Sequence, residues 1–148
     1  MGRNVPKVRG LQARKTFRAV TKAIDLGLIK ACHDLSEGGL AVAAAEMALA
    51  GGFGIELDLT KVPKRAVDRD DFVLFSESNS RFLVEIPEKA KAEFEALMRG
   101  VVCAEIGRVT RNPKLTINSL KGTIKVEASL ADLRRSWKET LSSGVSEA

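Results

Sequence analysis

The sequence is poor in residues that mark several functional classes: its 148 residues include no tyrosine, one tryptophan, one histidine and two cysteines. A lone histidine without a C-x-x-C pair cannot build a zinc site of the usual kind. The scarcity of aromatic side chains argues against a nucleic-acid partner, because nucleic-acid surfaces stack bases on aromatic rings. Cys32, which lies in an apolar run, is predicted to be a buried free thiol, and a disulfide with Cys103 is unsupported.

Long apolar runs are also missing. No stretch approaches the roughly 20 residues that a membrane-spanning helix needs. The first 18 residues are basic and interrupted by Pro6 and Gly10, so they lack the apolar centre of a signal peptide. We therefore expect a cytoplasmic protein with no membrane partner.

The composition suits one folded domain: 45% of the residues are hydrophobic and 29% are charged. The net charge of +5 is unevenly placed, because seven basic residues precede the first acidic residue, Asp25. A solvated basic helix face is the favoured interpretation, and a surface that faces an acidic partner or a phosphorylated ligand is the second. The seven residues are Arg3, Lys7, Arg9, Arg14, Lys15, Arg18 and Lys22.

Hydrophobic periodicity divides the chain into an N-terminal arm or linker (1–10), a single domain (11–142) and a loose tail (143–148). Within the domain we expect helices at 11–26, 38–50 and 88–99, strands at 28–33, 54–59, 81–86 and 101–109, and a polar loop at 60–71. A hairpin of 115–118 and 123–127 follows, and then a final helix capped by Ser129 and Asp132. The buried faces should include Phe17 of the first helix and Trp137 and Leu141 of the last. This order predicts an α+β fold with a mixed or antiparallel sheet layered with helices.

The most informative motif is the run H-D-L-S-E-G-G-L at 33–40. It opens into an alanine-rich helix that is apolar all round and therefore buried. Free amides at such a helix start suit a phosphate or a carboxylate, and Asp34 could hold a divalent metal that carries the phosphate. Alternatively, Asp34 or Ser36 caps the helix's own amides.

A second polar cluster, S-E-S-N-S-R-F, occupies residues 76–82 ahead of a predicted strand. Glu77 and Arg81 could form a surface ion pair worth under about 1 kcal/mol. His33 and Asp34 should point to opposite faces of their strand, so His33 is interpreted as a structural hydrogen-bonding residue rather than a base. The sequence has no nucleophile pattern, Walker loop or G-x-G-x-x-G motif that would indicate an independent enzyme.

Taken together, the two motifs closely resemble the C-terminal domain of the large subunit of phosphoribosylformylglycinamidine synthases. The likeness runs from the V-P-K-V segment at 5–8 to the last helix. The resemblance implies a synthetase C-terminal-like fold and a part in an ATP-dependent, magnesium-assisted reaction that converts formylglycinamide ribonucleotide to its amidine. It places Asp34 as a magnesium ligand. It also places a substrate- or phosphate-binding set at Ser36, Gly38, Gly39, Glu77, Ser78 and Asn79.

The resemblance is to the second copy of this domain in the synthase, which carries His33, Ser36 and Ser80 at these positions and builds an auxiliary site. Because only one part of a two-part unit is present, we expect the chain to contribute scaffold and an auxiliary phosphate or magnesium site. We expect no catalysis by the isolated domain and no cofactor requirement of its own. The implied partners are the ATP-binding domain, in the same or a separate chain, the glutaminase and the small accessory subunit; a homodimer is also conceivable. The alternatives are the equivalent domain of a selenophosphate synthetase or a hydrogenase-maturation relative, and a stand-alone binding or interaction module.

Overall fold

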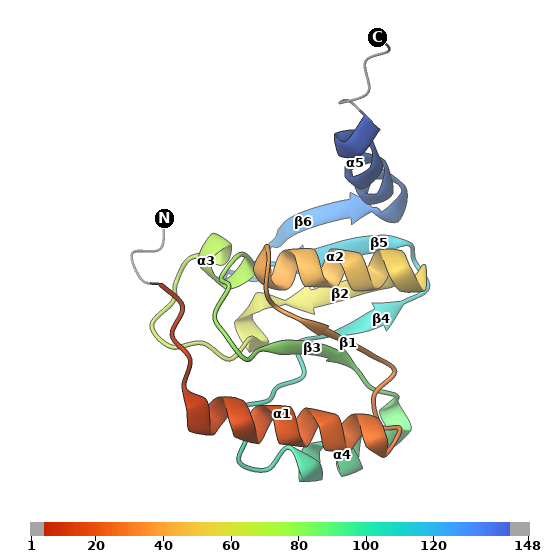
Figure 1. Cartoon of the computed structure of the whole chain (residues 1–148). Helices are drawn as coiled ribbons and strands as arrows, with labels where there is room; N and C mark the ends of the chain where they lie inside the picture. Colours follow the sequence, from red (N-terminus) through yellow and green to blue (C-terminus); the bar gives the residue numbers. More distant parts are fainter. Residues whose placement is uncertain (1–4, 143–148) are drawn as a thin grey trace.

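The computed structural model describes residues 5–142, apart from the side chains of 124, 125 and 140–142. The strands form two sheets: an antiparallel pair, β1–β3, and a four-stranded sheet in the order β4-β2-β5-β6 (Figure 1). In the larger sheet β2 and β5 are parallel, and the other neighbours are antiparallel. The predicted α+β fold with a mixed sheet is therefore confirmed. The elements are α1 (Gly10–Asp25), β1 (Ala31–Asp34), α2 (Gly39–Gly51), β2 (Gly54–Asp58), η1 (Leu59–Lys61), α3 (Asp70–Leu74), β3 (Phe82–Glu85), η2 (Glu88–Ala90), α4 (Lys91–Leu97), β4 (Gly107–Thr110), β5 (Lys114–Asn118), β6 (Ile124–Ser129) and α5 (Leu130–Ser142).

Helix α2 lies over the four-stranded sheet and anchors the main core. Small alanine side chains let the helix approach its neighbours closely, and Leu40, Ala43, Ala44 and Ala48 are almost fully buried. They pack against alternate residues of β2 and β5, so the predicted buried helix is confirmed. The start of α2 is therefore held firmly in place.

A second, smaller core lies between the β1–β3 sheet and the helices α1 and α4, which lie side by side (Figure 1). Val20 and Ala23 of α1 meet Phe94 and Met98 near α4. The periodicity of α1 predicts Phe17 on this buried face, but the residue is 48% exposed. Its ring makes an edge-to-face contact with Phe82, at 5.7 Å between ring centroids. The prediction that Phe17 lies on the buried face of its helix is therefore wrong.

The largest differences between predicted and observed strand or loop boundaries have causes in the hydrogen bonds at those positions. The strand predicted at 28–33 begins only at Ala31, since the Leu28 N–H is used to close α1 by donating to the Ala23 carbonyl at 3.0 Å. The strand predicted at 101–109 is confined to 107–110. These residues pair with β2, and the last bond to β2 runs from the Asp58 N–H to the Ile106 carbonyl at 2.8 Å, where β2 ends. The loop predicted at 60–71 overlaps η1 and the start of α3, where the Asp70 carboxylate accepts the N–H of Leu120 at 2.8 Å.

The C-terminal hairpin and the cap of the last helix are confirmed. Ser129 Oγ accepts the Asp132 N–H at 3.1 Å, and its hydroxyl donates to the Asp132 carboxylate at 2.6 Å. Trp137 is 63% exposed, so its predicted burial is wrong, and Leu141 lies outside the described side chains. Residues 1–4 of the predicted arm and the predicted tail also lie outside the described residues. Within 5–142, no helix combines the length and apolar character needed to cross a bilayer.

Candidate functional site

The pairing of β1 with β3 brings the two polar motifs together. Asp34, the last residue of β1, pairs with Phe82, the first residue of β3, and the Leu35 N–H donates to the Arg81 carbonyl at 3.0 Å. The turn at 34–39 and the turn at 76–81 therefore lie at the same end of the small sheet. Helix α2 begins at that end.

The absence of side chains at the paired glycines allows the backbones of the two turns to approach closely. Gly38 and Gly39 both have positive φ angles, of 71° and 62°, which L side chains rarely adopt. A Cβ atom on Gly39 would lie 2.7 Å from the Ser76 carbonyl oxygen and 2.8 Å from that of Leu74. The backbone of the second motif thus occupies the space that any side chain at residue 39 would need.

The first turn does not cap its own helix. No side chain of residues 33–38 accepts a hydrogen bond at the start of α2, so the alternative in which Asp34 or Ser36 caps it is wrong. Instead, Glu77 Oε1 accepts the Gly38 N–H at 3.0 Å from the other motif. A carboxylate is favourable there because the start of a helix carries partial positive charge.

Arg81 shapes the second turn and does not pair with Glu77, so the predicted ion pair between these two described residues is absent. Its Nε donates to the Ser78 carbonyl at 3.3 Å, and its Nη2 donates to the Ser76 carbonyl. Burial lowers the pKa of the Arg81 guanidinium. The hydroxyls of Ser76 and Ser78 share a hydrogen bond of 2.8 Å.

His33 joins β1 to α2. Its Nε2 lies 2.9 Å from Glu46 Oε2, and its Nδ1 lies 2.6 Å from the Asp34 carbonyl oxygen. Both ring nitrogens face protein acceptors, which supports the interpretation of His33 as a structural hydrogen-bonding residue.

The structure brings together only part of the predicted set. Gly38, Gly39 and Glu77 make direct contacts between the turns. By contrast, residues 34, 36 and 79 are exposed, and within the described part of the chain their side chains form no hydrogen bond to the opposite turn. Among the described residues, no group of three or more histidine, cysteine, aspartate or glutamate side chains is arranged to hold a metal ion. The hydrogen bonds from Arg81 to two backbone carbonyls are not predicted by the motif, because a short motif does not show which backbone atoms a side chain reaches.

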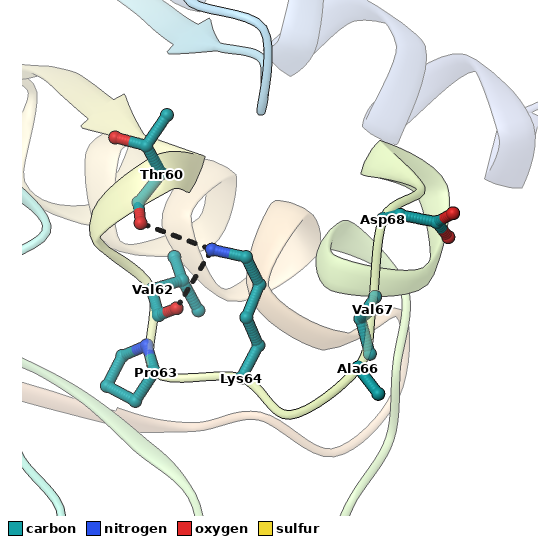
Figure 2. A pocket seen from close by; sticks show the side chains of 7 residues that line it. All are labelled: Thr60, Val62, Pro63, Lys64, Ala66, Val67 and Asp68. Carbon is teal, nitrogen blue, oxygen red and sulfur yellow. Dashed lines mark hydrogen bonds between the residues drawn. The ribbon is translucent and has the colours of Figure 1, made fainter.

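A pocket of about 780 Å³ is lined by residues between 60 and 68 and by no residue of the two turns (Figure 2). Lys64 Nζ donates to the carbonyl oxygens of Leu59 and Thr60, both at 3.1 Å, and of Val62 at 3.4 Å. These bonds use the three donors of the ammonium group. Lys64 therefore caps the end of η1, and its ammonium group has no donor left for a ligand.

Comparison with known proteins identifies the family. The family model described as AIR synthase related protein, C-terminal domain, matches residues 2–119. The chain belongs to this family. This assignment confirms the resemblance carried by the two motifs.

Relatives of this AIR synthase related C-terminal domain include two named phosphoribosylformylglycinamidine synthase subunit PurL. The protein from Deinococcus radiodurans is 36% identical over 137 residues, which cover 93% of this chain and 18% of the relative. The protein from Thermococcus sibiricus is 42% identical over 104 residues, which cover 70% of this chain and 14% of the relative. The chain thus spans less than a fifth of either relative.

Solved structures show the same fold. Phosphoribosylformylglycinamidine synthase II from Thermotoga maritima has a TM-score of 0.77 and 19% identity, over 87% of this chain and 22% of the other. The structure of T. maritima PurL complexed with ATP has a TM-score of 0.70 and 22% identity, over 81% of this chain and 21% of the other. Both likenesses concern one domain of a much longer protein.

Proposed function

We propose that this chain is the C-terminal domain of a PurL-type phosphoribosylformylglycinamidine synthase, an ATP-dependent ligase of purine biosynthesis. The observation that carries the proposal is the 36% identity to a PurL subunit across 93% of the chain. Residues 11–142 act as one domain that completes the scaffold against an ATP-binding domain. The glutaminase and the small accessory subunit are the further partners, and the setting is cytoplasmic.

The joined turns are the binding element of this proposal. Ser36, Gly38 and Gly39 lie at the start of α2, where phosphate is favoured. The Ser36 hydroxyl is an available donor, whereas the Gly38 N–H donates to Glu77 at 3.0 Å and the Gly39 N–H to the Ser36 carbonyl at 3.3 Å, so a phosphate would have to displace these acceptors. Ser78 and Asn79 offer exposed polar side chains from the facing turn. Glu77 belongs to the same set, although its carboxylate here holds the Gly38 amide.

A magnesium ion fits this donor set only if other groups complete its coordination. Asp34 presents one carboxylate that is 60% exposed. Magnesium in nucleotide sites is commonly held by one or two carboxylates together with phosphate oxygens and waters. Asp34 would therefore hold the ion jointly with the phosphates of ATP, and the chemistry the ion supplies is neutralisation of phosphate charge.

The experiment that tests this proposal is a calorimetric titration of the purified chain with Mg-ADP and with formylglycinamide ribonucleotide. We expect saturable Mg-ADP binding that Asp34→Asn weakens by about tenfold or more, since the change removes a charged ligand while keeping the side-chain shape. Asp25→Asn, at the end of α1, is the matched control and should bind as the unchanged chain does. We also expect neither ATP hydrolysis nor amidine formation by the chain alone.

Three results would count against the proposal in different ways. Turnover by scrupulously purified chain would contradict its role as a scaffold. Equal weakening by both aspartate variants would remove Asp34 from the site. A well-folded chain that binds neither ligand would show that the turns do not form a site without the ATP-binding domain.

A further inference from the structure

Arg81 is an unusual cation in this protein because it is partly buried without a carboxylate partner among the described residues. Its guanidinium donates there only to backbone carbonyls, those of Ser76 and Ser78. Burial disfavours its charged form, and no acid in the described part of the chain offsets that effect. Such an arrangement needs geometry that compensates for the lost hydration.

The two carbonyls flank Glu77, so Arg81 grips the turn on both sides of that residue. A guanidinium is planar and its donors are fixed in a fork, which sets the relative position of the two acceptors. Ser80, directly before Arg81, has a φ of 64°, a strained value for a residue other than glycine. Strained backbone of this kind persists where surrounding contacts hold it.

We propose that Arg81 is a positioning residue: it fixes the 76–80 turn so that the Glu77 carboxylate stays on the Gly38 amide and sets the start of α2. In this role Arg81 need not touch a ligand. The contacts lie within this chain and do not depend on the proposed function. Only the identity of the ligand at the start of α2 rests on that function.

The test is a double-mutant cycle read at the Gly38 amide of the chain without added nucleotide, by ¹⁵N NMR and amide hydrogen exchange. Glu77→Ala and Arg81→Met should each shift the Gly38 resonance and speed its exchange by about tenfold, the effect of losing a hydrogen bond to a charged group. The double variant should change Gly38 no more than the larger single change, because both act through one contact. Arg108→Met, which removes the exposed 2.7 Å ion pair with Glu56, is the matched control and should leave Gly38 unchanged.

Additive effects, or an unchanged Gly38 amide in Arg81→Met, would overturn the proposal. If Arg81→Met does not fold, Arg81→Lys replaces it, because lysine keeps the charge but cannot fork to both carbonyls. A folded Arg81→Lys variant with wild-type exchange at Gly38 would equally overturn it. If neither the unchanged chain nor any variant binds Mg-ADP, the proposed binding site is contradicted. The double-mutant cycle at Gly38 still tests the role of Arg81, because it is measured without nucleotide.

Discussion

At the scale of single residues, Cys32 shows how the small sheet shapes reactivity. The predicted burial of Cys32 is wrong: residues of β1 alternate between half-buried and exposed, and Cys32 lies on the exposed face with Asp34. The apolar run in the sequence is typical of a covered strand. Within residues 5–142, however, the β1–β3 sheet has two strands, and one face of β1 is exposed.

Partial desolvation by the surrounding protein and, second, the Asp34 carboxylate raise the pKa of the Cys32 thiol. Because the thiolate is the reactive form, Cys32 should react slowly with iodoacetamide. Asp34→Asn removes the negative charge and lowers the pKa of this thiol, so alkylation at pH 8 should quicken by about twofold. Mass spectrometry of the tryptic peptides measures the alkylation rate of Cys32 in the unchanged chain and in the Asp34→Asn variant.

Cys103 is the internal control for that experiment. Burial and Glu95, not Asp34, raise the pKa of the Cys103 thiol. Its alkylation rate should be the same in both proteins. An unchanged rate at Cys32, or an equal rise at Cys103, would contradict the assigned cause.

At the scale of elements, helix α2 offers a comparison between its two ends. Gly39 and Gly52 both have positive φ, of 62° and 71°. A methyl group on Gly39 would lie within 3 Å of backbone atoms, whereas one on Gly52 would meet no atom of the described residues within 4 Å. Gly52→Ala should therefore cost about 1 kcal/mol of unfolding free energy, from the strained φ alone. Gly39→Ala should cost about 3 kcal/mol or more, since the two turns must also separate.

Urea denaturation measures the unfolding free energy of both glycine variants against the unchanged chain. Equal losses at the two positions would show that the turns yield easily to an added methyl group.

The same helix marks what the sequence can predict. The all-round apolar pattern of α2 and the alternation of β2 are local, and both elements form where those patterns predict them. Helix α3 escapes prediction because it has only five residues and depends on a contact between Asp70 and Leu120, fifty positions away. Strand β4 is shorter than its apolar run because its partner β2 ends at Asp58.

The candidate site likewise has features that the sequence predicts and features that it does not. Its residues and its position at the start of α2 follow from the spacing of two motifs. The bond from Gly38 to Glu77 depends on a non-local strand register, and the grip of Arg81 on two carbonyls depends on a turn conformation. Local sequence patterns predict neither contact.

At the scale of the whole molecule, exposed ion pairs tie strands and helices together and should make stability depend on acid. Side-chain partners lower the pKa of several carboxyls: Asp58, Asp71, Glu105, Glu127 and Asp132. A carboxyl whose pKa is lower in the folded protein than in the unfolded chain stabilises the fold above the unfolded pKa. That contribution disappears as pH falls through the folded pKa. We therefore expect a nearly constant Tm from pH 7 to about 5 and a fall below about pH 4.

A variant of Glu127 distinguishes the effect of one carboxyl's lowered pKa on stability from the general effect of the protein's rising positive charge at low pH. Its carboxylate lies 2.7 Å from Lys114 Nζ, across the pair of strands β5 and β6, and this lysine is the main cause of its lowered pKa. Glu127→Gln should lower Tm at pH 7, where the ion pair exists, and this deficit should shrink as the pH falls through the lowered pKa of the Glu127 carboxyl in the folded protein. Glu85→Gln changes a glutamate at the end of strand β3 that forms no ion pair within the described part of the chain, so it should match the unchanged chain at pH 7 and at low pH. Differential scanning calorimetry decides the matter: a Glu127→Gln deficit that persists at low pH would mean that packing of the side chain, rather than its charge, stabilises the hairpin.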